Sequence, residues 1–253
     1  MSQSFRLSQI LDRARKEGRV SVDALAVEFD VAAQTIRRDL TDLAEAGKLE
    51  RVHGGAVLPS GVANIGYEDR RSLNAAAKQA IARCCGALIP NGASVFLNIG
   101  TTTEAVARAL LHHEDLLVVT NNMNVATILA ANPEAEIIVA GGTLRRSDGG
   151  LIGHQTIRTI EQFKFDVAVI GCSALDPDGD VLDFDVEEVS VSQSIIARSR
   201  QSILVSDQSK FQRTAPARIT SLQQIDHFVT DAALPGDLAT KCGSWDTAIH
   251  LAE

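Results

Sequence analysis

The sequence predicts an α/β protein in which a winged helix-turn-helix domain precedes a larger domain with a mainly parallel sheet. Before residue 48, apolar residues recur at helical spacing in three short segments, and a loosely alternating, glycine-containing stretch follows them. After residue 64, near-continuous apolar strands alternate with helices, which is typical of a parallel sheet covered on both faces. A chain of 253 residues is long enough for two such domains.

The first domain, residues 1–58, is expected to contain three helices and a hairpin. The helices are predicted at residues 6–16, 22–29 and 33–46. Ser21 caps the second helix, whereas Gly18 and Gly47 end the first and the third. Residues 48–58 contain His53-Gly54-Gly55 and alternate loosely, which predicts a small β-hairpin.

The third predicted helix has one apolar and one polar face. At about 100° per residue, its buried stripe consists of Ile36, Leu40 and Leu43. The opposite face carries Gln34, Arg38 and Thr41, with Arg37 on its flank. Gln and Arg side chains pair with base edges and phosphates in a DNA groove, and we expect Asp39 and Asp42 to lie off this face because phosphates repel carboxylates. An ordinary amphipathic surface helix has the same composition, so the pattern alone leaves both interpretations open.

The net charge of −8 first argues against a nucleic-acid partner. Residues 1–60, however, hold nine basic and nine acidic side chains, which leaves 15 against 23 for the remainder. The excess of acid therefore belongs to the second domain, and DNA contact by the neutral first domain depends on where its arginines point. The acidic second domain should disfavour indiscriminate DNA binding.

Cysteine usage and hydropathy indicate a reduced, cytoplasmic protein. The four cysteines form no CxxC pair and no zinc-ligand spacing. Cys84 and Cys85 fall on a predicted helix, where adjacent side chains diverge, so a redox switch has little support. The first 18 residues are charged throughout, and no run is long enough for a membrane span. We expect no metal, no cofactor and no membrane partner.

The second domain, residues 75–253, follows a linker at residues 59–74 that begins with a Pro- and Gly-containing stretch. Its strands are predicted at residues 94–99, 116–120, 136–140, 167–171 and 202–206. Its helices are predicted at residues 102–111, 124–131 and 187–199. No element is assigned after residue 235.

Polar or glycine-rich turns follow all five of these strands. They are Gly100-Thr101-Thr102-Thr103, Thr120-Asn121-Asn122, Gly141-Gly142 with Arg145 and Arg146, Gly171-Cys172-Ser173, and Asp207 with Lys210. Ligands of open parallel sheets bind outside the carboxyl ends of the strands, and amides and hydroxyls at a helix N-terminus can hold a phosphate. Each turn alone is an ordinary helix cap, so the predicted ligand site depends on the five together.

The segment from Asp176 to Glu188 contains seven acids and no base. Part of its spacing matches a calcium loop, but Val181 occupies the position that requires glycine, so we expect a turn at Asp176-Pro177-Asp178-Gly179 and no calcium. Asp183, Asp185 and Glu188 either approach the pocket and bind ligand hydroxyls or belong to a solvated acidic loop; for Asp185 both interpretations carry equal weight.

The first domain resembles the DeoR family of bacterial transcriptional repressors. The resemblance is carried by Gln34-Thr35-Ile36-Arg37-Arg38-Asp39-Leu40, by Leu43, Gly47, Leu49 and Arg51, and by His53-Gly54-Gly55-Ala56. It implies that Gln34, Thr35, Arg37 and Arg38 lie on a DNA recognition helix and that His53 lies in the wing. With Thr41 and Ser21 these residues are the candidate DNA contacts.

The second domain is similar to the DeoR sensor domain, so that the resemblance covers about residues 5–232. It is carried by Asn98-Ile99-Gly100-Thr101-Thr102, Thr120-Asn121-Asn122, Asp148-Gly149-Gly150 and residues 207–211. It implies a fold similar to ribose-5-phosphate isomerase and a phosphorylated effector. The candidate effector contacts are Asn98, Gly100, Thr101, Thr102, Thr103, Thr120, Asn121, Asn122, Gly142, Arg145, Gly171, Asp183, Glu188 and Lys210. Two departures concern the effector: Asn98 stands where many members have Asp, and Ser192-Gln193 replace a common basic pair.

The sequence therefore predicts a repressor that binds operator DNA as a homodimer or homotetramer. A phosphorylated three-carbon polyol would bind the sensor domain and favour a state with weaker DNA affinity. The alternative is an enzyme similar to a sugar-phosphate isomerase, with Asp183 or Glu188 and Lys210 as acid-base groups. Fold similarity alone does not establish that chemistry.

Overall fold

The computed structural model describes residues 3–17, 19–52, 54–57 and 67–253. The predicted wing residue His53 and residues 59–66 of the predicted linker lie outside the described residues. None of the described helices combines the length and the apolar character that crossing a bilayer requires.

The first domain has the predicted order of three helices and a hairpin. Its helices are α1 (Gln3–Glu17), α2 (Val22–Glu28) and α3 (Ala33–Glu45), and its strands are β1 (Arg19–Ser21), β2 (Glu50–Val52) and β3 (Gly55–Val57). Ser21 accepts a hydrogen bond of 3.1 Å from the amide of Ala24 and so caps α2, as predicted. Gly47 has a φ of 68° and follows the end of α3, also as predicted. Strand β1 was not predicted; it pairs with β3 and makes the hairpin a three-stranded sheet.

A buried ion pair joins the first and third helices. Asp39 is 1% exposed, and both of its carboxylate oxygens accept hydrogen bonds from Arg6, at 2.5 Å and 3.1 Å. Ile36 and Leu40 flank it within the apolar core of the domain. The expectation that Asp39 lies off the polar face of α3 is therefore confirmed, and the carboxylate fixes α3 against α1.

The second domain is built on a parallel sheet of seven strands in the order β15-β14-β12-β9-β4-β5-β6. The strands are β4 (Ser94–Leu97), β5 (Leu116–Thr120), β6 (Ala135–Val139), β9 (Phe165–Ile170), β12 (Ser199–Val205), β14 (His227–Thr230) and β15 (Ala248–Leu251). From β4 the chain first adds β5 and β6 on one side and then β9, β12, β14 and β15 on the other. The strand order therefore reverses between β4 and β9, which is where open α/β sheets bind ligands.

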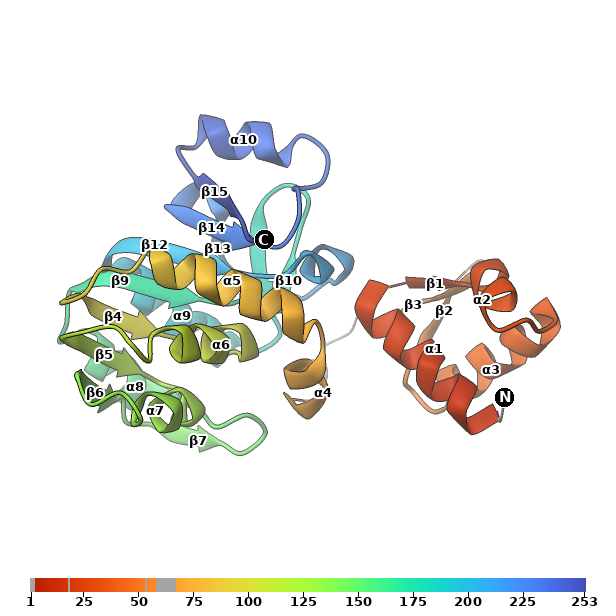
Figure 1. Cartoon of the computed structure of the whole chain (residues 1–253), viewed down its shortest axis with the longest axis horizontal. Coiled ribbons are helices and arrows are strands. Elements are labelled where there is room, and N and C mark those ends of the chain that lie inside the picture. The colour runs from red at the N-terminus through yellow and green to blue at the C-terminus, as the bar shows by residue number, and fades with distance from the viewer. Residues whose placement is uncertain (1–2, 18, 53, 58–66) are drawn as a thin grey trace.

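Helices cover both faces of this sheet (Figure 1). One face packs on α5 (Ala75–Ala87), α6 (Thr101–Ala109) and α7 (Met123–Leu129), and the other on α8 (His154–Ile160), α9 (Val186–Ala197) and α10 (Leu238–Ser244). Successive side chains of a strand point to opposite faces of the sheet, so each face has its own apolar core. Val95 and Leu97 of β4 face the first group of helices, whereas Phe96 faces the second and packs edge-on against Phe165 at 5.3 Å.

Short elements complete the second domain. They are α4 (Tyr67–Ser72), the hairpin β7 (Thr143–Arg145) and β8 (Gly150–Ile152), the antiparallel strands β10 (Ala174–Leu175), β11 (Asp180–Asp183) and β13 (Ala217–Ser221), and two 3-10 turns at Gln208–Gln212 and Leu222–Gln224. The predicted turn forms at Asp176, whose carbonyl accepts from the amide of Gly179 at 2.9 Å. Residues after 235, to which no element was assigned, form α10 and the edge strand β15, with Leu238 and Cys242 buried.

Breaking the Arg6–Asp39 pair on one side should destabilise the first domain, because the remaining charge stays buried without a partner. We expect Asp39→Ala to lower the free energy of unfolding by about 3–5 kcal/mol. The double variant Arg6→Met with Asp39→Leu should recover most of this loss, since no charge is left behind. Urea denaturation followed by circular dichroism measures both; a wild-type midpoint for Asp39→Ala would contradict the role given to this pair.

Candidate functional site

The five predicted polar turns all lie at one edge of the seven-stranded sheet. Every strand pair in this sheet is parallel, so the turns after β4, β5, β6, β9 and β12 share its carboxyl edge. The turns after β4, β9 and β12 line one pocket, next to the reversal of strand order. The turns after β5 and β6 lie farther along the edge and contribute no lining residue.

The pocket brings together seven of the candidate effector residues. These are Gly100, Thr101, Thr102, Gly171, Asp183, Glu188 and Lys210. Gly100 precedes α6 with a φ of 149°, a backbone conformation that favours glycine, and so starts the helix beside the pocket. The first amides of an α-helix have no partner within the helix, so those of α6, beside the hydroxyls of Thr101 and Thr102, have the chemistry to accept an anion.

Several cations lie at or near the pocket. Lys210 and Arg70 line it, Arg213 lies close enough to Lys210 to affect its ionisation, and Lys78 donates to the backbone carbonyl of Arg70. Burial, reinforced by neighbouring cations, lowers the pKa of Lys210 and of Lys78 to about 8 in each case. Nε of Arg70 and Nη1 of Arg213 are buried and have no hydrogen-bond partner among the residues that the structure describes. Such orphaned cationic donors favour an anionic ligand.

The carboxylate of Asp207 lies within this basic group, and that of Asp148 lies 3.4 Å from Arg70. Asp207 is 2% exposed and accepts hydrogen bonds from Asn74 at 2.9 Å and Ser209 at 3.1 Å. Burial raises its pKa, but the charge of Lys210 and the hydrogen bonds outweigh that effect, so the pKa lies below its ordinary value. Asp207 therefore stays ionised and holds the cations together without neutralising all of them.

The sequence analysis missed Arg70, Lys78 and Arg213, because these residues lie far apart in the chain and outside the strand-end turns. One signal could have revealed Lys78. It occupies the buried stripe of α5 with Ile81, Ala82 and Cys85, where an apolar residue is expected. A lysine that is 6% exposed on the core side of a helix points to a charged site beside the core.

Two carboxylates also line the pocket, those of Asp183 and Glu188. Asp183 is 4% exposed, and Glu188 lies on the first turn of α9. Burial and the charge of Asp183 raise the pKa of Glu188 to about 7, although Arg145 opposes the shift. Near neutral pH, Glu188 can therefore accept a hydrogen bond from a ligand hydroxyl or donate one. Asp185 caps α9 and pairs with Arg145 at 2.9 Å, so it does not belong to a free solvated loop.

The guanidinium of Arg145 is already surrounded by carboxylates. It lies 2.7 Å from Asp148, 2.9 Å from Asp185 and 2.6 Å from Glu188. Burial raises the pKa of Asp148, but the hydrogen bonds and charge of Arg145 outweigh it and leave the pKa below its ordinary value. Arg145 does not line the pocket, but it contacts the lining residue Glu188 directly and the lining residue Arg70 through Asp148.

Three other candidate residues lie outside the pocket lining, and their side chains bond to the protein itself. Asn98 donates to Oγ of Ser192 at 2.9 Å, Thr103 to the carbonyl of Asn98 at 2.7 Å, and Thr120 to the carbonyl of Leu97 at 2.6 Å. The hydrogen bond from Asn98 also accounts for Ser192, one of the departures from the family pattern. These polar side chains stabilise the strand ends that form the pocket.

In the turns after β5 and β6, the candidate residues are likewise engaged with the protein itself. Asn121 donates to the carbonyl of Leu151 at 3.1 Å, and Asn122 caps α7 by accepting from the amide of Asn124 at 2.9 Å. At Gly142, with a φ of 148°, a Cβ would lie 2.2 Å from Oγ1 of Thr156, so only glycine fits. None of these three candidates lines the pocket.

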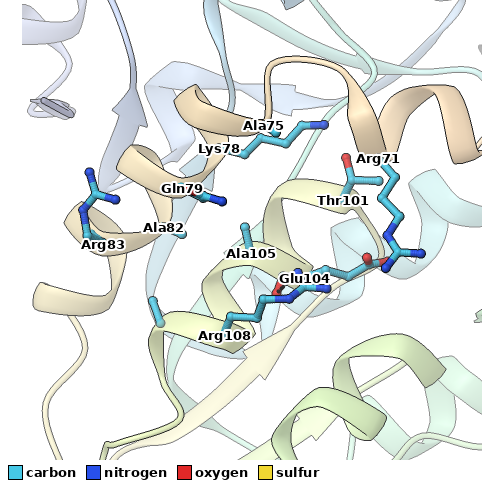
Figure 2. Close-up of a pocket in the computed structure, with 11 residues that line it drawn as sticks. Arg71, Ala75, Lys78, Gln79, Ala82, Arg83, Thr101, Glu104, Ala105 and Arg108 are labelled. Atoms are coloured by element: carbon cyan, nitrogen blue, oxygen red, sulfur yellow. Dashed lines mark hydrogen bonds between the residues drawn. The ribbon is translucent and has the colours of Figure 1, made fainter.

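A wider groove of about 460 Å³ lies between α5 and α6 (Figure 2). Arg71, Lys78, Arg83 and Arg108 line it together with Glu104, and Thr101 lines both this groove and the pocket. Figure 2 shows the side chains of Arg71 and Glu104 approaching one another where α4 meets α6. The N-terminal turn of α6 thus separates the pocket from the groove.

The outer face of α3 has the exposure that the sequence predicts. Ile36, Leu40 and Leu43 are buried. Gln34, Arg37, Arg38 and Thr41 are exposed, and Thr35 is partly exposed. The hydroxyl of Thr41 donates to the carbonyl of Arg37 at 2.9 Å, while no side chain caps the start of α3. Ser21 is engaged in capping α2. The helix therefore presents two arginines, a glutamine and uncapped amides on one side.

Both halves of the chain match families of known proteins. The DeoR-like helix-turn-helix domain matches residues 6–62, and the DeoR C terminal sensor domain matches residues 73–232. The glycerol-3-phosphate regulon repressor of Haemophilus influenzae is 47% identical over 230 residues, which cover 91% of this chain and 90% of that protein. The protein of the same name from Escherichia coli is 45% identical over 235 residues, with 93% of each chain covered. The HTH-type transcriptional repressor CsqR of Escherichia coli is 38% identical, covering 93% of this chain and 90% of that protein.

Similarity to solved structures is lower. A D-ribose-5-phosphate isomerase in complex with phospho-erythronic acid is 17% identical, with a TM-score of 0.40, and covers 53% of this chain and 52% of that one. The translation initiation factor eIF-2B of Pyrococcus horikoshii is 14% identical, with a TM-score of 0.44, and covers 60% and 61%.

Anion binding in the pocket should weaken as the pH rises, because Lys78 and Lys210, with pKa values of about 8, lose their charge. A phosphate monoester is already a dianion above pH 7, so a change in affinity at higher pH comes from the ionisation of the protein. We expect at least about a tenfold loss of affinity between about pH 7 and pH 9.5, and a weaker, flatter profile for Lys210→Met. Isothermal titration calorimetry measures it, and equal affinity at both pH values would contradict the assignment.

Proposed function

Because the chain belongs to the DeoR family, we propose that it is a transcriptional repressor that binds operator DNA through α3 and senses a phosphorylated metabolite in the pocket of its second domain. One observation carries the proposal: the pocket is lined both by the cations Arg70 and Lys210 beside the start of α6 and by the carboxylates of Asp183 and Glu188. A phosphorylated polyol carries the complementary groups: a phosphate that pairs with the cations and hydroxyls that donate to the carboxylates. The polar face of α3 supports the DNA-binding half of the proposal.

The pocket suggests how such an effector would bind. Its phosphate would accept hydrogen bonds from Arg70, Lys210 and the first amides of α6, which meet an anion with charge-assisted donors. Its hydroxyls would lie toward Asp183 and Glu188. Two relatives at 45% and 47% identity are named glycerol-3-phosphate regulon repressors, so glycerol 3-phosphate is the effector that we propose.

Regulation requires that the effector bind the two states of the protein unequally. A difference of about 1.4 kcal/mol between the DNA-bound and the released state changes operator affinity tenfold. We propose that the effector favours release and that the protein acts as a homodimer or homotetramer, because helix-turn-helix proteins read paired half-sites. The enzyme alternative would require turnover of a sugar phosphate, and conversion of ribose 5-phosphate by the purified protein would establish it.

Arg38→Ala should weaken operator binding by about 1–3 kcal/mol, because an exposed arginine on the outer face of α3 contacts base edges or phosphates. Arg158→Ala is the matched control: it removes the same charge from an exposed position on α8 of the second domain. Fluorescence anisotropy with a labelled operator measures both variants. Undiminished affinity of Arg38→Ala would show that α3 is not the recognition helix.

Glycerol 3-phosphate should stabilise the protein against heat, since a ligand that binds only the folded state adds about 2.7 kcal/mol at one hundred times its dissociation constant. Unphosphorylated glycerol should not stabilise it, and Thr102→Ala, at the start of α6, should reduce the shift. A thermal-shift series with several sugar phosphates measures this effect. If no phosphorylated compound stabilises the protein, the sensor assignment fails.

A further inference from the structure

Tyr67 connects the chain that leaves the first domain to two helices of the second. It is the only tyrosine in the sequence and the first described residue after residues 58–66. Its hydroxyl lies 3.0 Å from each carboxylate oxygen of Glu104 on α6, and it accepts a hydrogen bond of 3.0 Å from Nδ2 of Asn124 on α7. A single hydroxyl therefore ties the start of α4 to the helices beside the pocket.

Glu104 makes this contact a strong one. The residue is 2% exposed. Tyr67 donates to it, and Asn124 donates to its Oε1 at 3.1 Å. Because a buried carboxylate requires such donors, Glu104 holds Tyr67 in place. Burial and the charge of Glu104 raise the pKa of Tyr67 to about 12, so the hydroxyl keeps the proton that it donates.

The hydrogen bonds of Asn124 continue to the turn at Asp148. The same Nδ2 of Asn124 donates to the carbonyl of Asp148 at 3.0 Å. The carboxylate of Asp148 accepts hydrogen bonds from Arg145 at 2.7 Å and 2.9 Å, and from Arg70 at 3.4 Å. A Cβ at Gly149 would lie 3.3 Å from Nδ2 of Asn124, so the turn fits closely against that amide. A displacement of Asp148 therefore acts directly on Asn124.

We propose that Tyr67 is a positioning residue that transmits occupancy of the pocket to the segment between the two domains. The proposal rests on the function proposed above and identifies how the effector reaches the DNA-binding domain. Its route runs from the pocket to Asp148, then to Asn124, and then to the hydroxyl of Tyr67.

Two changes at the pocket converge on Asp148 when a phosphorylated polyol binds. The phosphate attracts Arg70, which lines the pocket, has an unpartnered Nε and lies at the longer distance of 3.4 Å from Asp148. The hydroxyls compete for Glu188, which Arg145 otherwise contacts at 2.6 Å. Asp148 thus loses one cation and keeps a second whose partners have changed. The turn shifts, and the hydrogen bonds of Asn124 shift with it.

Tyr67→Phe tests the proposal in the full-length protein, because it removes the hydroxyl and keeps the ring. Operator affinity without effector and glycerol 3-phosphate affinity without DNA should each stay within about twofold of the wild type. The factor by which saturating glycerol 3-phosphate weakens operator binding should fall from about tenfold or more to below about threefold, since coupling factors of 5–150 are typical. A purely structural role would change the two separate affinities and leave this factor intact.

The control is Thr127→Ala, which removes a hydroxyl from α7 that donates only to the carbonyl of Met123. It should keep the wild-type coupling factor. A wild-type factor in Tyr67→Phe would overturn the proposal for Tyr67. A wild type that binds both ligands without any coupling, or binds neither, would overturn the proposed function instead, so the two failures are distinguishable.

A second measurement needs no substitution. Because the chain has one tyrosine, biosynthetic 3-fluorotyrosine gives a single ¹⁹F resonance from Tyr67. Saturation with glycerol 3-phosphate should shift that resonance as the hydrogen bonds of the hydroxyl change, whereas glycerol should leave it in place. A resonance that stays unchanged at saturating glycerol 3-phosphate would overturn the proposal.

Discussion

Positive charge buried at the carboxyl edge of a parallel sheet is the constraint on which the second domain depends. Lys210 and Arg213 are brought together after β12, and Arg70 approaches from α4. Asp207 and Asp148 contact some of these cations, and among the described residues Nε of Arg70 and Nη1 of Arg213 have no hydrogen-bond partner. Burying cationic donors without hydrogen-bond partners lowers the stability of the folded domain. An anion that supplies those partners removes this cost, and this contributes to the affinity that we propose for a phosphorylated ligand.

The sequence predicted the fold where periodicity extends over several residues. The three helices of the first domain, the five sheet strands and the turn at Asp176 all appear where they were expected. The three-residue strand β1 is too short to show a period, and the tail could not be assigned because α10 and β15 are also short. Tertiary packing, which buries Leu238 and Cys242, decides their structure.

The site was predictable only in part, for a physical reason. The turn residues Gly100, Thr101 and Thr102 line the pocket, but Thr120 and Asn122 bond to nearby backbone groups. A polar side chain at a strand end can either satisfy the backbone or face a ligand, and its residue type does not distinguish the two. The cations at positions 70, 78 and 213 become neighbours only through the fold, which no local pattern reveals.

The two domains differ in charge: the second is acidic, whereas the first is neutral and exposes two arginines on the outer face of α3. The central claim is that the phosphorylated effector and operator DNA bind opposing states of one protein. The most direct measurement is the affinity for glycerol 3-phosphate with and without saturating operator, beside the affinity for operator with and without effector. Both affinities should fall, and by the same factor, because coupling between binding sites is reciprocal. An effector affinity that operator DNA leaves unchanged would contradict the account.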